Sequence, residues 1–192
     1  TKLGCTISRG GQRGATIGVD GGPRADLDDC LWDTHWVDTV RYVGGADVAV
    51  ISDGMWDTTE RNIPGVTDGW TTLDDPEFAD HLYSEMLGAT DALVDAGVGT
   101  VVWTTVASNP QRDIPTYDRR RAVLNDLISR VVEARPDTTV LVDLAGRLDD
   151  PNIPDPRTDG VHLSVESGVE LWETWLIDEI VGAVADGGSD GS

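Results

Sequence analysis

Apolar residues along the chain form two kinds of pattern, short valine-rich runs and longer segments with helical spacing. The short runs have the composition of strands that are buried on both faces of a sheet. They cover residues 46–52, 99–107 and 138–145. In the longer segments apolar residues recur every three or four positions, which predicts amphipathic helices. These segments cover residues 31–43, 76–97, 116–137 and 164–186.

Strand and helix alternate from residue 31 onward, and this order predicts parallel βαβ units in a three-layer α/β sheet. A chain of 192 residues suits one domain, and no internal repeat divides it. We therefore expect a single domain over residues 1–186 and a flexible tail over residues 187–192. Residues 1–31 are rich in glycine, and we expect them to form an irregular loop.

The loops that follow the strands are where a parallel sheet binds its ligands. Asp57 and Asn109 fall in two of these loops, and a third loop ends in the sequence TDGVHLS, residues 158–164. In this third loop Asp159 and His162 flank a glycine-containing turn, so their side chains can meet. A histidine that acts as a general base needs a carboxylate to fix its tautomer and to stabilise the imidazolium. The alternative is a surface turn with local hydrogen bonds only.

The chain carries 35 acidic and 14 basic residues, which gives a formal net charge of −21. Such an acidic surface repels phosphate backbones, so we expect no nucleic-acid partner. The acids are scattered along the chain, which favours a solubilising surface and leaves a cation-binding surface as the alternative. Paired ligands such as H-x-x-x-H are absent from the sequence, and we expect neither a metal nor a cofactor.

The segment DGVHLS, followed by the last amphipathic helix, resembles the last sequence block of the SGNH (GDSL-type) hydrolases. The segment LGCTISRGG resembles the second block of that family, and ADVAVISDGMWD resembles the third. The three segments occur in the family's order and span nearly the whole chain. The resemblance implies a flavodoxin-like parallel sheet and a Ser-His-Asp triad that hydrolyses or transfers esters.

By this resemblance, His162 is the general base of the triad and Asp159 orients its ring. Gly4, in the second block, matches the glycine whose backbone N–H contributes to the oxyanion hole. The third block usually reads G-x-N-D and corresponds here to residues 54–57, so Gly54 takes its first position. Trp56 stands where the family places an oxyanion-binding asparagine. Its indole N–H could donate instead, or the ring could pack beside the substrate.

The sequence contains no G-D-S, the motif that carries the family's nucleophilic serine after its first, central strand. That strand precedes the second block, so we expect the strand and its serine to lie upstream of Thr1. On this interpretation the chain is an N-terminally truncated fragment that is inactive without its serine. Ser8 follows no strand and opens no helix, and Ser52 and Ser108, at strand ends, are no better as candidates.

Cys5 and Cys30 both fall in the glycine-rich N-terminal stretch. A disulfide between them would stabilise the fold by about 3 kcal/mol in the chain-entropy model, and it would imply an oxidising compartment. The alternative is two unrelated thiols. The cysteine pair and the tryptophan-rich helix ahead of the third block resemble SGNH domains that are fused behind bacterial membrane acyltransferase modules. That resemblance implies an upstream membrane module and an extracytoplasmic location.

The expected function is ester hydrolysis or O-acyl transfer on an acylated carbohydrate, in particular a glycan of the cell envelope. The alternative belongs to a different class: a non-catalytic SGNH-like module that binds a glycan or a partner. A strand ending in G-D-S ahead of Thr1 would favour the enzyme, and a strand without serine would favour the binding module.

Overall fold

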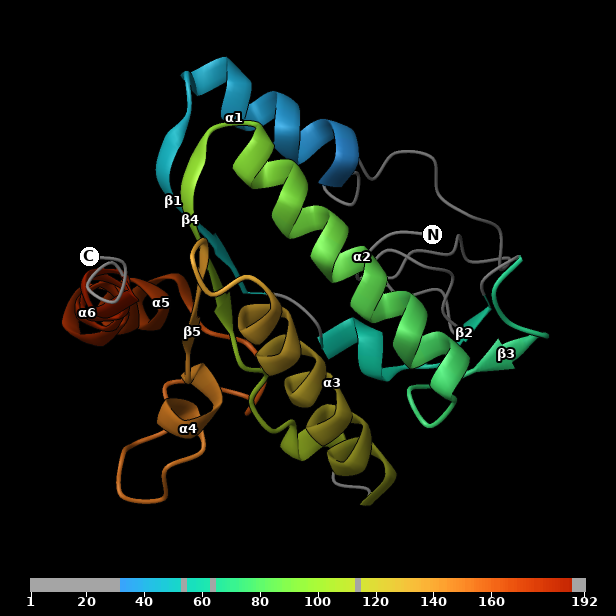
Figure 1. Ribbon diagram of the computed structural model, residues 1–192. Helices are drawn as coiled ribbons and strands as arrows, with labels where there is room; N and C mark the ends of the chain where they lie inside the picture. Colours follow the sequence, from blue (N-terminus) through green and yellow to red (C-terminus); the bar gives the residue numbers. More distant parts are fainter. Residues whose placement is uncertain (1–31, 53–54, 63–64, 113–114, 188–192) are drawn as a thin grey trace.

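The computed structural model describes residues 32–52, 55–62, 65–112 and 115–187 (Figure 1). Within these residues, three strands form a parallel sheet in the order β1-β4-β5. The strands are β1 (Ala46–Ile51), β4 (Val98–Thr104) and β5 (Thr139–Val142). The predicted α/β class and the parallel sheet are thereby confirmed.

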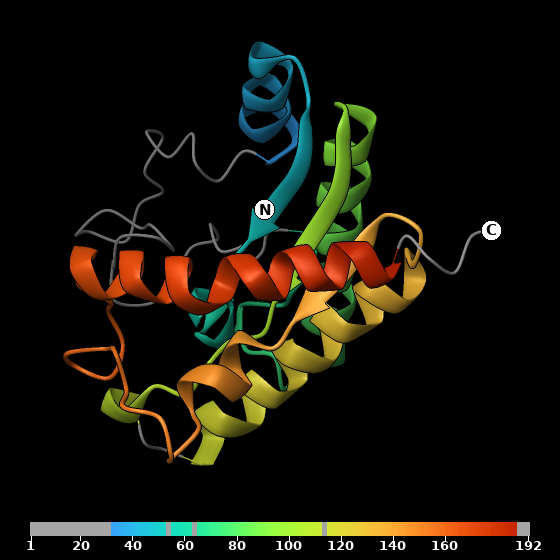
Figure 2. The same ribbon diagram turned by 90° about the vertical axis from the view of Figure 1, so that its left-hand side faces the viewer.

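Helices cover both faces of this sheet, so the elements lie in three layers (Figure 2). One face carries α1 (Val37–Val43), α2 (Pro76–Asp95) and α3 (Pro115–Ala134). A long C-terminal helix covers the other face. This helix consists of α5 (Val165–Leu171), a π-helical turn (Trp172–Leu176) and α6 (Ile177–Gly187).

Short elements fill the connections between these strands and helices. A π-helical turn (Trp32–Trp36) precedes α1, and helix α4 (Leu144–Leu148) follows β5. The remaining elements are the 3-10 turns Met55–Thr58 and Pro110–Arg112 and the antiparallel pair β2 (Arg61–Asn62) and β3 (Trp70–Thr71). No helix among the described residues is long and apolar enough to cross a membrane. The predicted N-terminal loop and almost all of the predicted tail lie outside the described residues.

β4 is the central strand, and its side chains are buried on both faces of the sheet. Val101 and Trp103 pack into the core beneath α2 and α3, where Leu127 is also buried. Val102, between them in sequence, packs on the opposite face against Leu176. Because alternate residues of a strand point to opposite faces, such a strand needs apolar residues at consecutive positions. This requirement explains the valine-rich runs of the sequence.

Two predicted helix starts are confirmed by their capping contacts. Asp75 accepts a hydrogen bond from the N–H of Glu77 at 2.9 Å and so caps α2, with Pro76 at the first helical position. Ser164 caps α5 in the same way, because its hydroxyl oxygen accepts from the N–H of Ser167 at 3.1 Å. These side chains satisfy N–H groups that have no partner within the helix.

The third strand is shorter than the predicted run 138–145. β5 ends at Val142, because Asp143 caps α4 by accepting an N–H of its first turn at 3.0 Å. Thr105, just after β4, stabilises this switch from strand to helix. Its hydroxyl donates to Asp143 at 2.7 Å and accepts from the N–H of Ala145 at 2.8 Å.

β1 is an edge strand among the described residues, since β4 pairs with it on one side and no described strand pairs on the other. The C-terminal helix extends past this edge (Figure 2). Its first part exposes Val165, Val169 and Trp172, which we call the α5 apolar face. Their spacing of four and three residues places them on one side of the helix.

Replacing Thr90 by valine should destabilise the protein, because it removes the buried partner of an indole. Trp103 donates from Nε1 to Oγ1 of Thr90 at 3.1 Å, and both side chains are buried. Valine has a similar shape but leaves the indole N–H without an acceptor, which costs about 1–3 kcal/mol of unfolding free energy. Urea unfolding measures this change. In a Trp103→Phe background the same substitution should cost less, and a Thr90→Val protein as stable as the wild type would contradict the explanation.

Candidate active site

The carboxyl ends of the three parallel strands lie side by side, and we call this end of the sheet its carboxyl edge. The loops that leave the strands there form the candidate site. The turn Met55–Thr58 follows β1, the turn Pro110–Arg112 follows β4, and α4 follows β5. The loop between α4 and α5, residues 149–164, returns along this edge. Hydrogen bonds tie it to the loop that follows β4.

This returning loop brings Asp159 and His162 together. Nδ1 of His162 lies 2.8 Å from Oδ2 of Asp159. The other carboxylate oxygen accepts from the backbone N–H groups of Val161 and His162 at 2.9 and 2.7 Å. Gly160 makes the turn possible, because its φ of +77° is a conformation that other residues rarely adopt. The side chain of His162 is 74% exposed, so most of its ring is open to a reaction partner.

The pKa of Asp159 lies well below its usual range. The hydrogen bond with the His162 side chain is the main cause, and the backbone N–H groups of His162 and Val161 add to it. Because an ionised carboxylate only accepts hydrogen bonds, Nδ1 of the neutral ring carries the proton. Nε2 then has a free lone pair and can take a proton from an attacking hydroxyl. General-base catalysis requires this tautomer.

Contacts with the loop after β4 hold the turn in place. Gln111 donates from Nε2 to the backbone oxygen of Asp159 at 3.1 Å. Pro110 packs so closely on Gly160 that a Cβ at this position would collide with the proline ring. Asn109 orders this loop in turn, since it is buried and its side-chain oxygen accepts from the N–H of Gln111 at 3.0 Å. The Asp159–His162 turn is therefore fixed against the neighbouring strand end.

Two serines of the neighbouring segments, Ser108 and Ser164, are committed to other partners. Ser108 donates its hydroxyl to Oδ1 of Asp149 at 2.8 Å and its N–H to Oδ2 at 2.8 Å. Ser164 uses its hydroxyl oxygen to cap α5. Among the described residues, the ring of His162 hydrogen-bonds to Asp159 and to no hydroxyl or thiol. The described residues thus show the Asp159–His162 contact without a third member of a triad.

Several predicted positions lie outside the described residues, namely Gly4, Cys5, Ser8, Cys30 and Gly54. Their roles in the oxyanion hole, in a disulfide or as a nucleophile stay predictions. Trp56 lies in the turn that follows β1, at the carboxyl edge of the sheet, and its contact with a substrate also stays a prediction. Its neighbour Asp57 is a buried polar residue of the same turn.

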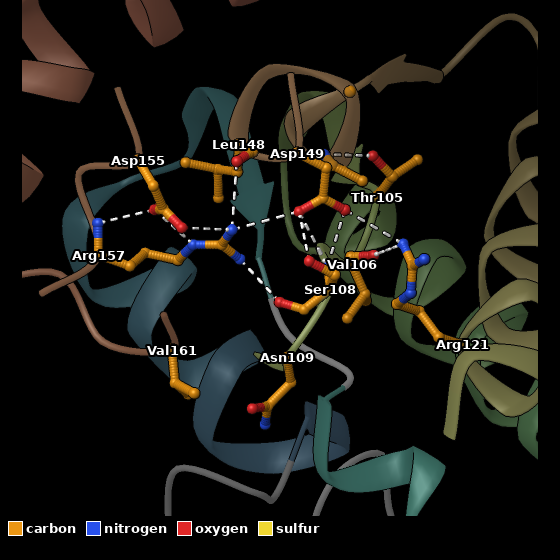
Figure 3. Close-up of polar contacts among 12 residues, drawn as sticks. Thr105, Val106, Ser108, Asn109, Arg121, Leu148, Asp149, Asp155, Arg157 and Val161 are labelled. Carbon is orange, nitrogen blue, oxygen red and sulfur yellow. Dashed lines mark hydrogen bonds and ion pairs between the residues drawn. The ribbon is translucent and has the colours of Figure 1, made fainter. Parts of the chain in front are cut away.

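Sequence reasoning missed an ionic cluster below the Asp159–His162 turn. Arg157 is buried and pairs with Asp155 and Asp149, and Arg121 of α3 contacts Asp149 from the other side (Figure 3). The available signal was the arginine itself, which stands alone among acids in the segment DDPNIPDPRTDG. A single cation in an acidic loop indicates an ion pair that shapes the loop.

The described part of the chain holds no group of three or more His, Cys, Asp or Glu side chains placed to bind a metal ion. Comparison with models of known protein families and with curated proteins finds no match.

The carboxyl of Asp159 should titrate well below about pH 3.9, the ordinary value for aspartate. Folding lowers this pKa, so the associated stabilisation is fully present above about pH 3.9 and is lost as the pH falls through the folded-state pKa. Carbon-13 NMR of the carboxyl group measures the midpoint. His162→Ala should raise the midpoint, because the imidazole is the main cause of the shift.

Glu173→Gln, which removes an exposed carboxylate from the C-terminal helix, is the matched control for this titration. It should leave the midpoint of Asp159 unchanged. A wild-type midpoint near the ordinary value, with no response to His162→Ala, would contradict the hydrogen-bonded pair.

Proposed function

We propose that this chain is the SGNH-type domain of an ester hydrolase or O-acyltransferase that acts on acylated carbohydrate of the cell envelope. The observation that carries the proposal is the Asp159–His162 pair, held on a loop at the carboxyl edge of a parallel sheet. Ligand sites of such sheets lie at this edge. The pair has the tautomer and the exposure of a general base, and ester chemistry of this kind needs no metal or cofactor.

In the proposed reaction, Nε2 of His162 takes the proton of a serine hydroxyl as the serine oxygen attacks the acyl carbonyl. Asp159 stabilises the imidazolium that forms. The imidazolium then protonates the leaving oxygen, the ester bond breaks, and an acyl-serine remains. Water attacks the acyl-serine in hydrolysis, and a sugar hydroxyl attacks it in O-acyl transfer. In both cases His162 takes the proton of the incoming group and returns it to the serine.

Two features of the described residues, the unpaired side of β1 and the α5 apolar face, support an additional strand beside β1. A parallel strand at this position would pair with the open backbone groups of β1 and would bring apolar side chains to the helix. The carboxyl end of this strand would also lie at the carboxyl edge of the sheet, where the Asp159–His162 loop is. A flavodoxin-like order, with the serine-bearing strand next to β1 and encoded upstream of Thr1, meets these requirements.

The proposed oxyanion hole consists of the backbone N–H of Gly4 and a donor near Gly54 and Trp56. The turn Met55–Thr58 places Trp56 directly after β1, close to the end of the proposed strand. Donors held in such a position stabilise the negative charge that develops on the carbonyl oxygen in the transition state. A Cys5–Cys30 disulfide, an extracytoplasmic location and an upstream membrane acyltransferase module belong to the same proposal.

A non-catalytic module that binds a glycan or a partner is the second candidate. One observation favours it: among the described residues, the ring of His162 has no hydroxyl at hydrogen-bond distance. The two candidates differ in a single chemical respect, because only the enzyme needs a reactive serine at this edge of the sheet.

His162→Ala should lower kcat for hydrolysis of p-nitrophenyl acetate by about 10⁴- to 10⁶-fold, by comparison with other triads. The protein for this assay includes the residues that its gene encodes ahead of Thr1. Asp159→Asn should have a comparable effect, because the ring then takes the wrong tautomer. Glu173→Gln is the matched control and should keep wild-type activity. Full activity of a folded His162→Ala protein would overturn the assigned role.

A fluorophosphonate probe separates the enzyme from the binding module. We expect the probe to label one serine, identified by mass spectrometry of the peptides, and His162→Ala to slow the labelling. Absence of labelling, combined with calorimetric binding of an O-acetylated oligosaccharide, would favour the binding module and reject the enzyme.

A further inference from the structure

The buried guanidinium of Arg157 connects the loop that carries His162 to the segments that follow β4 and β5. The side chain of Arg157 is only 6% exposed. Its Nε and Nη2 donate to the two carboxylate oxygens of Asp155 at 2.8 and 3.0 Å. Nη1 donates to the backbone oxygen of Ser108 at 2.8 Å. Nη2 also donates to the backbone oxygen of Leu148 at 3.1 Å and to Oδ1 of Asp149 at 3.2 Å.

These acceptors come from three segments that meet at the carboxyl edge of the sheet (Figure 3). Asp155 lies in the same loop as the arginine, Leu148 and Asp149 are at the end of α4, and Ser108 follows β4. Asp149 also pairs with Arg121 of α3 at 3.4 Å. Removal of the guanidinium would leave partly buried carboxylates and carbonyls without their donor, which is a costly arrangement.

Arg157 is also linked to the Asp159–His162 turn through the backbone. Its carbonyl oxygen accepts from the N–H of Gly160 at 3.1 Å. Its backbone pairs in an antiparallel bridge with Leu163, the residue that follows His162. The side chains of Asp159 and His162 are 40% and 74% exposed, so the turn is held mainly through its backbone. Gln111 and Pro110 contact it on one side, and Arg157 holds it at its base.

We propose that Arg157 is a positioning residue that sets where the Asp159–His162 pair stands at the edge of the sheet. A guanidinium presents five N–H donors in a rigid planar fork, which lysine does not reproduce. The fork fits the carboxylate of Asp155 on one side and backbone oxygens on the other. The consequence for catalysis rests on the proposed function, whereas the consequence for the geometry of the pair does not.

Arg157→Met should raise the pKa of Asp159 toward its ordinary value, by clearly more than the uncertainty of the titration. The hydrogen bonds that lower this pKa depend on the shape of the turn, and release of the base weakens them. Carbon-13 NMR measures the midpoint in the same protein as the activity assay. Arg157→Lys should give a smaller shift in the same direction.

Arg135→Met is the matched control, because it removes another two-pronged arginine–carboxylate contact. Arg135 donates to Asp91 at 2.7 and 2.8 Å where α3 ends, and this helix end lies at the opposite edge of the sheet. The control should leave the midpoint of Asp159 unchanged. A shift in this variant as large as in Arg157→Met would show a general loss of structure and would overturn the proposal.

Asp155→Asn tests the same fork if Arg157→Met does not fold. It weakens the contact but keeps the guanidinium, so the midpoint of Asp159 should rise by less than in Arg157→Met. An unchanged midpoint in both Asp155→Asn and Arg157→Lys, together with a lower melting temperature, would mean that Arg157 only stabilises the fold. That result would overturn the positioning role.

Activity separates this inference from the proposed function. In the active protein, Arg157→Met should lower kcat by about 100-fold with little change in KM, since a displacement of about 1 Å at a reacting group has that effect. If the wild-type protein has no esterase activity but Arg157→Met still raises the titration midpoint of Asp159, the positioning of the pair is supported and the ester chemistry is rejected. A raised midpoint with wild-type kcat would overturn the catalytic consequence of Arg157.

Discussion

The burial of β4 on both faces is the constraint on which the rest of the molecule depends. Val101 and Trp103 require α2 and α3 on one side, and Val102 requires the C-terminal helix on the other. Each buried side chain of this size contributes about 1.5–3 kcal/mol relative to the exposed state, so neither helical layer can be lost without a large cost. Parallel strands also need crossover connections, which here run through helices. The loops at the carboxyl ends of the strands remain outside this core, and they carry the candidate site.

The acidity of the chain gives its arginines different roles that depend on their burial. Arg119 donates to Asp74 at 2.7 and 2.8 Å, but the pair is exposed, and such contacts contribute little to stability. Arg157 is buried, and its charge is tolerated there because Asp155 and Asp149 surround it. An arginine–aspartate contact therefore contributes little to stability on the surface, whereas beneath the Asp159–His162 turn it holds the loop in its shape.

Features governed by neighbouring residues could be predicted from the sequence, and features governed by distant residues could not. The cap at Ser164 and the meeting of Asp159 with His162 depend on contacts over three residues, which a local pattern reveals. The end of β5 depends on Thr105, which lies 38 residues before Asp143. The fork of Arg157 reaches 49 residues back along the chain. No periodicity or spacing rule marks such partners, because only the fold brings them together.

Within the part of the chain that the structure describes, the outer side of β1 is unpaired, and this has a consequence for any molecule that lacks the proposed additional strand. An unpaired strand edge offers a template on which the sheets of separate molecules can join and aggregate. β1 itself carries a single charged residue, Asp47, so its own side chains give little protection. The net charge of −21 supplies the protection instead, because like-charged molecules repel one another at a distance. Salt shortens the reach of that repulsion to about 10 Å at 0.1 M, so the colloidal stability of the protein depends on ionic strength.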